Sequence, residues 1–142
     1  MEDAGLLRLG DSFKGATCLT NAEVTIFLAN AKSNYEANDK AVPEAFDQTL
    51  AYANRFSQIR HPVANMAAVQ GLRKELEAGE WTNDEMETEV KLEQFEIASL
   101  INLKPEEHEE AVALIPSLAK RFSESQVEDM IEKINRFSGS IN

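Results

Sequence analysis

The run Glu106 to Glu110, EEHEE, places one histidine among four carboxylates and is the segment best able to suggest a metal site. Zinc-binding helices use two histidines four residues apart, so that both nitrogens lie on one face. On a helix, Glu106 and Glu110 would share a face, while His108 would lie roughly opposite. We therefore interpret the run as the acidic, solvated start of a helix, where the helix dipole favours negative charge, and we predict no metal ligands.

No other residues form a reactive constellation. His61 precedes a proline at a predicted helix boundary, and Cys18 has no histidine near it in sequence. The six glycines form neither GxGxxG nor GxxxxGK[ST], so the common nucleotide-binding loops are absent. The segment 83–94 fails as a calcium loop because it lacks the central glycine and has Val90 and Lys91 where ligands are required. We predict no catalytic and no cofactor-binding residues, and hence a protein that is not an enzyme.

The composition favours a soluble protein that acts through other proteins. The 142 residues carry a formal net charge of −11, which repels phosphate backbones, so any contact with RNA is expected only indirectly, through a partner. No apolar run approaches the roughly 20 residues of a membrane span, and no membrane contact is expected. MEDAGLLRLG does not look like a secretory signal, and the single cysteine favours a reducing compartment, the cytosol or nucleus.

Apolar spacing and capping signals predict a mainly α-helical chain. Thr20 with Glu23 and Ser123 with Gln126 form two capping boxes, and Pro116 disfavours helical geometry at Ile115. The predicted helices cover about 20–37, 43–60, 63–78, 92–103, 105–114 and 123–137. The acidic stretch 79–89, GEWTNDEMETE, is interpreted as a loop that leads into a helix.

Residues 1–19 are unlike the rest and are predicted to form a short extended arm. Leu6, Leu7, Leu9 and Phe13 lie among three glycines, a pattern too short and glycine-rich for a helix. An apolar strand edge needs a cover, and no second strong strand exists in this chain to supply one. We expect the arm to add to a partner's sheet. The alternative is that it folds back onto its own helices.

Four segments, in order, resemble the fourth subunit of eukaryotic RNA polymerase II, which belongs to a family of stalk proteins with a related counterpart in archaeal RNA polymerase. They are EDAGLLRLGDSF at 2–13, TLAYANRFS at 49–57, LEQFEIASLINLKPEE at 92–107 and EEAVALIPSL at 109–118. The most specific element is ALIPSL, from Ala113 to Leu118. Two features depart from the family pattern: the stretch 79–89 looks like an insertion, and Lys104 stands where a small residue is frequent.

The resemblance implies an HRDC-like helical bundle over residues 20–142, with an acidic insertion near 79–89, preceded by the arm at 1–19. It also implies a heterodimer with the seventh polymerase subunit, whose sheet accepts the arm and whose barrel contacts RNA. The pair would dock as a stalk on the polymerase core, at the clamp near the RNA exit path. It would act in the nucleus, in transcription initiation and factor recruitment.

The expected partner-binding residues come from the arm and from the last helix break: Leu6, Leu7, Leu9, Phe13, Leu114, Ile115, Pro116 and Leu118. Burial of the four arm residues would contribute roughly 6–12 kcal/mol of gross association energy, much of it offset by lost freedom. For 114–118, an intramolecular helix corner is the alternative.

Two other functions are alternatives that the sequence leaves open. The first alternative is the equivalent stalk subunit of another polymerase, polymerase III or an archaeal one, although ALIPSL and the acidic arm favour polymerase II. A free-standing HRDC-like module that binds nucleic acid is the second alternative, and the acidic net charge disfavours it.

Overall fold

The computed structural model describes residues 3–13, 15–83 and 88–139, and these are mainly helical, as predicted. In chain order the elements are the 3-10 turns η1 (Ala4–Leu6) and η2 (Asp11–Phe13), helices α1 (Asn21–Ala37), α2 (Glu44–Phe56) and α3 (Met66–Ala78), strands β1 (Trp81–Asn83) and β2 (Thr88–Val90), helices α4 (Gln94–Leu103) and α5 (His108–Leu114), turn η3 (Pro116–Leu118) and helix α6 (Glu124–Gly139). Among the described helices, none is long and apolar enough to cross a membrane.

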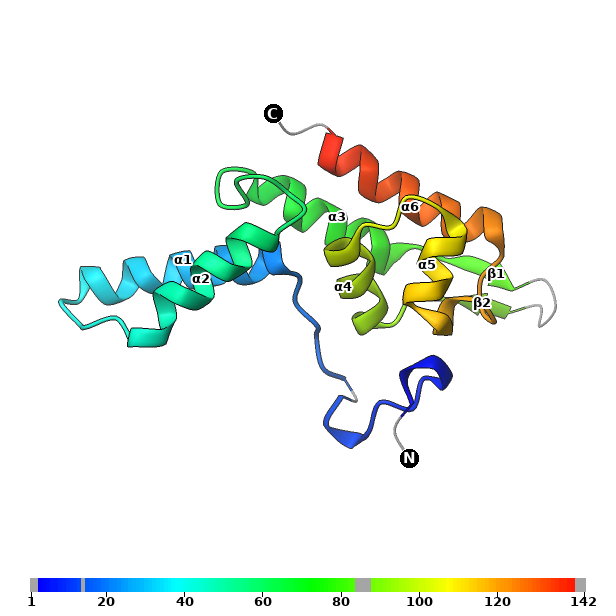
Figure 1. Ribbon diagram of the computed structural model, residues 1–142, viewed down its shortest axis with the longest axis horizontal. Helices are drawn as coiled ribbons and strands as arrows, with labels where there is room; N and C mark the ends of the chain where they lie inside the picture. Colours follow the sequence, from blue (N-terminus) through cyan, green and yellow to red (C-terminus); the bar gives the residue numbers. More distant parts are fainter. Residues whose placement is uncertain (1–2, 14, 84–87, 140–142) are drawn as a thin grey trace.

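Helices α1 and α2 form an antiparallel hairpin that extends away from the other helices (Figure 1). The predicted capping box starts α1, with Thr20 and Glu23 each accepting the other's backbone N–H. Towards the tip, the rings of Tyr35 and Phe46 meet edge to face with centroids 6.1 Å apart. Lys32 bonds Asp47 at 2.9 Å beside them. The hairpin is therefore held largely by contacts between its own two helices.

The remaining helices enclose the core. Its least accessible side chains come from α3, α4, η3 and α6 and include Leu72, Leu76, Ile97, Leu100, Leu118, Val127 and Met130. Helix α3 lies against α6, and Gly71 faces Phe137 so closely that a Cβ there would stand 2.9 Å from the ring. The predicted capping box at the start of α6 is confirmed, since Ser123 and Gln126 exchange hydrogen bonds.

The acidic stretch 79–89 forms part of a β-hairpin and not the predicted loop into a helix. Strands β1 and β2 pair antiparallel, with Trp81 opposite Val90; residues 84–87 lie outside the described residues. The indole of Trp81 packs edge to face on Phe122 at 5.7 Å, and its Nε1 donates to Asp129 at 3.3 Å. Periodicity along the chain cannot reveal such contacts, because their partners lie more than 40 residues away on the approach to α6 and within it.

Helix α5 begins at His108 and not at Pro105 as predicted, while its end at Leu114 is confirmed. Lys104 adopts a left-handed conformation, φ 45°, that terminates α4, and Pro105 is buried in the connection. The Glu106 N–H donates to the Glu110 carboxylate at 3.0 Å. This hydrogen bond lies one residue before the cap Glu107, which itself makes no side-chain cap hydrogen bond. His61 lies in the exposed turn before α3, which starts at Met66.

Gly79→Ala is expected to lower the free energy of unfolding by about 1–3 kcal/mol, because the new methyl group would overlap the Trp81 indole. A Cβ at Gly79 would stand 2.7 Å from Cζ3 and 2.9 Å from Cζ2 of that ring. Urea unfolding of the single variant measures the loss. In a Trp81→Leu background the same change should cost less than about 0.5 kcal/mol. Equal costs in both backgrounds would contradict the proposed overlap.

Candidate partner-binding surface

The arm folds into a closed turn, defined here as residues 3–8. The Asp3 N–H donates to the Arg8 carbonyl at 2.6 Å, and the Arg8 N–H donates back to the Asp3 carbonyl at 2.8 Å. Within the turn, the Asp3 carboxylate accepts the Gly5 N–H at 3.0 Å and caps η1. Leu7 closes η1 in the left-handed region, with φ 59° and ψ 27°.

In residues 3–13 this turn and η2 replace the extended backbone predicted there, while the arm at 1–19 as a partner-binding unit stays a prediction. Aspartate at the cap and glycine at Gly10, where φ is 83°, supply the chemistry of tight turns. That chemistry shapes the backbone more strongly than the apolar residues between these positions, which had suggested a strand. The addition of the arm to a partner's sheet stays a prediction.

The apolar side chains of the arm are only partly covered. Leu6 is 48% exposed and Phe13 52% exposed, while Leu7 and Leu9 are half-buried. Leu7, Leu9 and Phe13 line a hollow whose lining also includes the charged residues Arg8, Asp11 and Glu93. Apolar groups gathered on a surface in this way mark a site that another molecule can cover.

At the second predicted segment the structure divides the residues into two kinds. Leu114 is 47% exposed and Pro116 is exposed, so both are available to a partner. Ile115 and Leu118 are 3% and 0% exposed and belong to the chain's own core. The alternative interpretation, an intramolecular helix corner, therefore describes Ile115 and Leu118 in the lone chain, and their role in partner binding stays a prediction.

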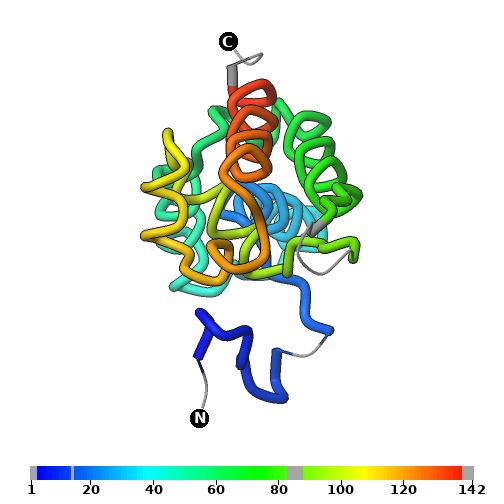
Figure 2. Tube along the Cα trace, turned by 90° about the vertical axis from the view of Figure 1, so that its right-hand side faces the viewer, coloured from blue at the N-terminus to red at the C-terminus, as the bar shows by residue number. Residues whose placement is uncertain are grey.

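Turn η1 packs on η3, which brings the two predicted segments together. At Gly5 the two segments are close, because a Cβ there would lie 3.7 Å from the Cβ of Pro116. The arm lies along one side of the helical body, as Figure 2 shows. Leu6 and Pro116, 110 positions apart by their residue numbers, are thus parts of one surface.

A buried carboxylate fixes the helix corner on which the arm rests. Glu96 is completely inaccessible and accepts hydrogen bonds from Ser117 at 2.6 Å and from Arg121 at 2.7 and 2.8 Å. Its Oε1 also accepts the Glu93 N–H at 2.7 Å. Arg121 in turn donates to the Lys91 carbonyl. A buried charge is tolerated only with such complete pairing, so these contacts join α4 rigidly to the corner.

Arg73 fixes the end of the arm that joins α1, at Cys18. This guanidinium, nearly buried in α3, donates to the Cys18 carbonyl, to Glu23 with Nε at 3.0 Å and to Gln94 at 2.7 Å. Burial alone would raise the pKa of Glu23, but the hydrogen bonds from Arg73 and Thr20 and the charge of Arg73 outweigh it, so the pKa lies below its ordinary value. The arm therefore leaves the body from a fixed point.

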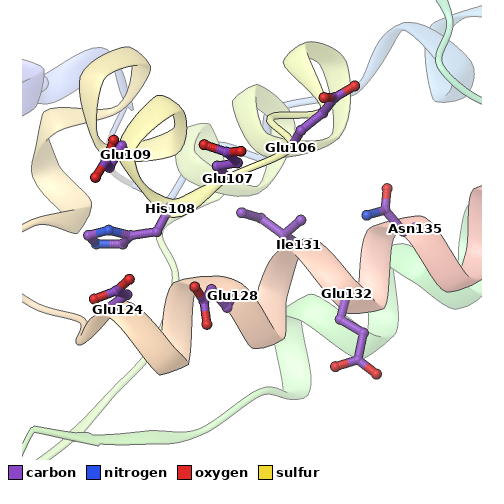
Figure 3. A pocket seen from close by; sticks show the side chains of 9 residues that line it. All are labelled: Glu106, Glu107, His108, Glu109, Glu124, Glu128, Ile131, Glu132 and Asn135. Atoms are coloured by element: carbon purple, nitrogen blue, oxygen red, sulfur yellow. The ribbon is translucent and has the colours of Figure 1, made fainter.

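The acidic run identified first in the sequence lines a cleft of about 510 Å³ between the start of α5 and helix α6. Figure 3 shows Glu106, Glu107 and Glu109 on one side and Glu124, Glu128 and Glu132 on the other, with His108 projecting into the cleft. Among the described residues, no group of His, Cys, Asp and Glu has the geometry to hold a metal ion. The cleft is thus a concentration of negative charge on the surface.

Sequence reasoning misses the two arginine–carboxylate clusters. In the sequence, Arg73 and Arg121 look like scattered surface charges, and Glu96 looks like no more than part of a motif. A signal exists for Glu96, since it stands between Phe95 and Ile97 in a helix that is apolar on several sides. A carboxylate in such a helix requires a cation, and the sequence alone does not say which one.

Comparison with known proteins gives consistent matches. The sequence model of the family described as RNA polymerase Rpb4 matches residues 18–138. The chain is 33% identical over 137 residues to DNA-directed RNA polymerase II subunit 4 of Arabidopsis thaliana, covering 94% of this chain and 88% of the relative. It is 30% identical over 151 aligned positions to DNA-directed RNA polymerase II subunit rpb4 of Dictyostelium discoideum, covering 94% and 87%. The Schizosaccharomyces pombe subunit rpb4 is 27% identical, covering 94% and 90%.

Arg121→Met is expected to lower the free energy of unfolding by about 3–5 kcal/mol, because it leaves the Glu96 charge buried without its cation. Lys120→Met is the matched control at the exposed neighbouring position, and it should change stability by less than about 0.5 kcal/mol. Chemical denaturation of both variants measures the difference. Equal effects would mean that the buried ion pair contributes nothing specific.

The Glu23 contact predicts a pH dependence of stability. Because the pKa of Glu23 is lower in the folded than in the unfolded chain, its contribution is fully present above the unfolded pKa and is lost as pH falls through the folded pKa. Glu23→Gln should therefore lose less stability than the parent between about pH 6 and about pH 3. Glu36→Gln, at an exposed position of the same helix, serves as control and should follow the parent curve.

Proposed function

The chain belongs to the RNA polymerase Rpb4 family, and on that premise we propose that it is a non-catalytic subunit of RNA polymerase II that pairs with the seventh subunit. In this proposal the pair forms a stalk on the polymerase core, at the clamp near the RNA exit path. It supports transcription initiation and the recruitment of factors in the nucleus. The single observation that carries the proposal is the similarity, over 94% of the chain, to relatives named as subunit 4 of RNA polymerase II.

The surface of the arm supports a stable heterodimer. If the arm extends, Leu7, Leu9 and Phe13 fall on one face, because side chains alternate along a strand. A strand added to a partner's sheet would place these three residues in the partner's apolar surface. Leu114 and Pro116, exposed beside the docked arm, extend the same contact region.

The charge supports an indirect role towards RNA. With a net charge of −11 and an acidic cleft along α5 and α6, the chain repels a phosphate backbone. In the proposed pair, the seventh subunit makes the contacts with RNA. The same charge argues against the free-standing nucleic-acid module, and the names of the matched relatives favour polymerase II over polymerase III or an archaeal enzyme.

Co-expression with the seventh subunit of RNA polymerase II is expected to yield a one-to-one complex, measured as a molar mass by light scattering. Leu7→Asp combined with Leu9→Asp should abolish this complex, because two carboxylates would be buried in an apolar contact. The helical circular dichroism of the lone chain should remain, since neither leucine belongs to the core.

Phe27→Asp is the control, a similar apolar-to-charged change at a side chain 65% exposed on α1, and it should preserve the complex. A complex that survives both arm substitutions would exclude the arm as the contact. A parent chain that stays monomeric beside the seventh subunit would contradict the heterodimer itself.

A further inference from the structure

We propose that the closed turn, residues 3–8, is an intramolecular latch that holds the arm on the η3 corner in the lone chain and must open before a partner can take the arm as a strand. The inference rests on the proposed function, because it concerns how the partner gains access to the arm. It goes beyond that function by assigning the arm two exclusive conformations.

The first argument is the use of backbone donors. The N–H groups of Asp3, Leu6, Leu7 and Arg8 all donate within the turn, at 2.6, 3.1, 3.1 and 2.8 Å. The Gly5 N–H is occupied by the Asp3 carboxylate. A strand that joins a sheet must extend and donate alternate N–H groups to its neighbour. The same groups cannot do both, so the closed turn excludes strand addition.

The second argument is the conformation of Leu7. Its φ of 59° lies in the left-handed region, where the Cβ of any residue other than glycine meets its own backbone. Extension of the arm moves Leu7 to a favourable region and relieves this strain. The strain at Leu7 therefore offsets part of the free energy that opening the turn requires. Such a turn is suited to open when a partner binds.

The third argument is the position of the turn. Turn η1 packs on η3, and Leu7 and Leu9 are half-buried, whereas no residue of η1 or η2 is fully buried. The packing of the closed turn on η3 thus covers part of the apolar surface of the arm. It also keeps residues 3–8 from presenting an extended strand edge that could pair wrongly. A partner has to bind the open form better than the closed one, which lowers its apparent affinity by the fraction of chains that are open.

A disulfide between residues 5 and 116 tests the latch. A Cβ at Gly5 would lie 3.7 Å from the Cβ of Pro116, within the roughly 3.5–4.5 Å that a disulfide requires. The variant combines Gly5→Cys and Pro116→Cys, with Cys18→Ser to remove the natural thiol. The oxidised full-length chain is expected to form less of the one-to-one complex with the seventh subunit in light scattering than the same sample after reduction. Both states lack Pro116, so its part in the contact region cancels in the comparison.

Each outcome decides a separate point. An oxidised chain that still forms as much of the complex as the reduced chain would contradict the proposed latch. Failure of the two cysteines to form the disulfide, measured by mass spectrometry, would also contradict it. The reduced form carries the same substitutions, including the loss of Pro116 from the contact region, so only the covalent link differs between the two states. Matching circular dichroism of both forms controls for folding. If the unmodified chain also forms no complex, the heterodimer proposal fails and the latch falls with it.

Discussion

The buried carboxylate of Glu96 is the constraint on which the rest of the structure depends. It has no access to water, and its hydrogen bonds come from the start of α4, from the η3 corner and from the loop before α6. Because an unpaired charge in that position is strongly unfavourable, these segments can take only the relative positions that pair it. The position of Pro116, which lies against Gly5, is therefore set by the hydrogen bond between Glu96 and the neighbouring Ser117.

Arg73 performs a comparable role at the first residue of α4, Gln94. It joins the capping box of α1, the side chain of Gln94 and the carbonyl of Cys18, so three elements and the root of the arm share one cation. The body of the molecule is thus fixed by two arginine–carboxylate clusters. The part of the arm before Cys18, in contrast, is held by the backbone hydrogen bonds of the closed turn and by the contact of η1 with η3. Rigid support and a displaceable surface segment suit a protein that works by binding.

Much of the helical fold follows from local signals, and the errors share one physical cause. Capping at Thr20 and Ser123 and the stop before Pro116 depend on neighbours within a few residues, and these predictions are confirmed. The hairpin at Trp81 depends on contacts with the region of α6, which a local pattern does not contain. Ile115 and Leu118 are apolar, as interface residues are, and only the three-dimensional arrangement shows that they face the chain's own core.

The projecting hairpin of α1 and α2 has a consequence for cooperativity. Its fully buried residues, Ala22, Thr25, Ile26 and Ala53, include three within the first six residues of α1, at the end nearest the body. Towards the tip, the hairpin is held by an exposed ion pair and one aromatic contact. Amide hydrogens near the tip would therefore exchange through local opening, while those around Glu96 and Arg73 would await global unfolding. We therefore expect two levels of stability in the described helices, with outermost turns that open without loosening the core.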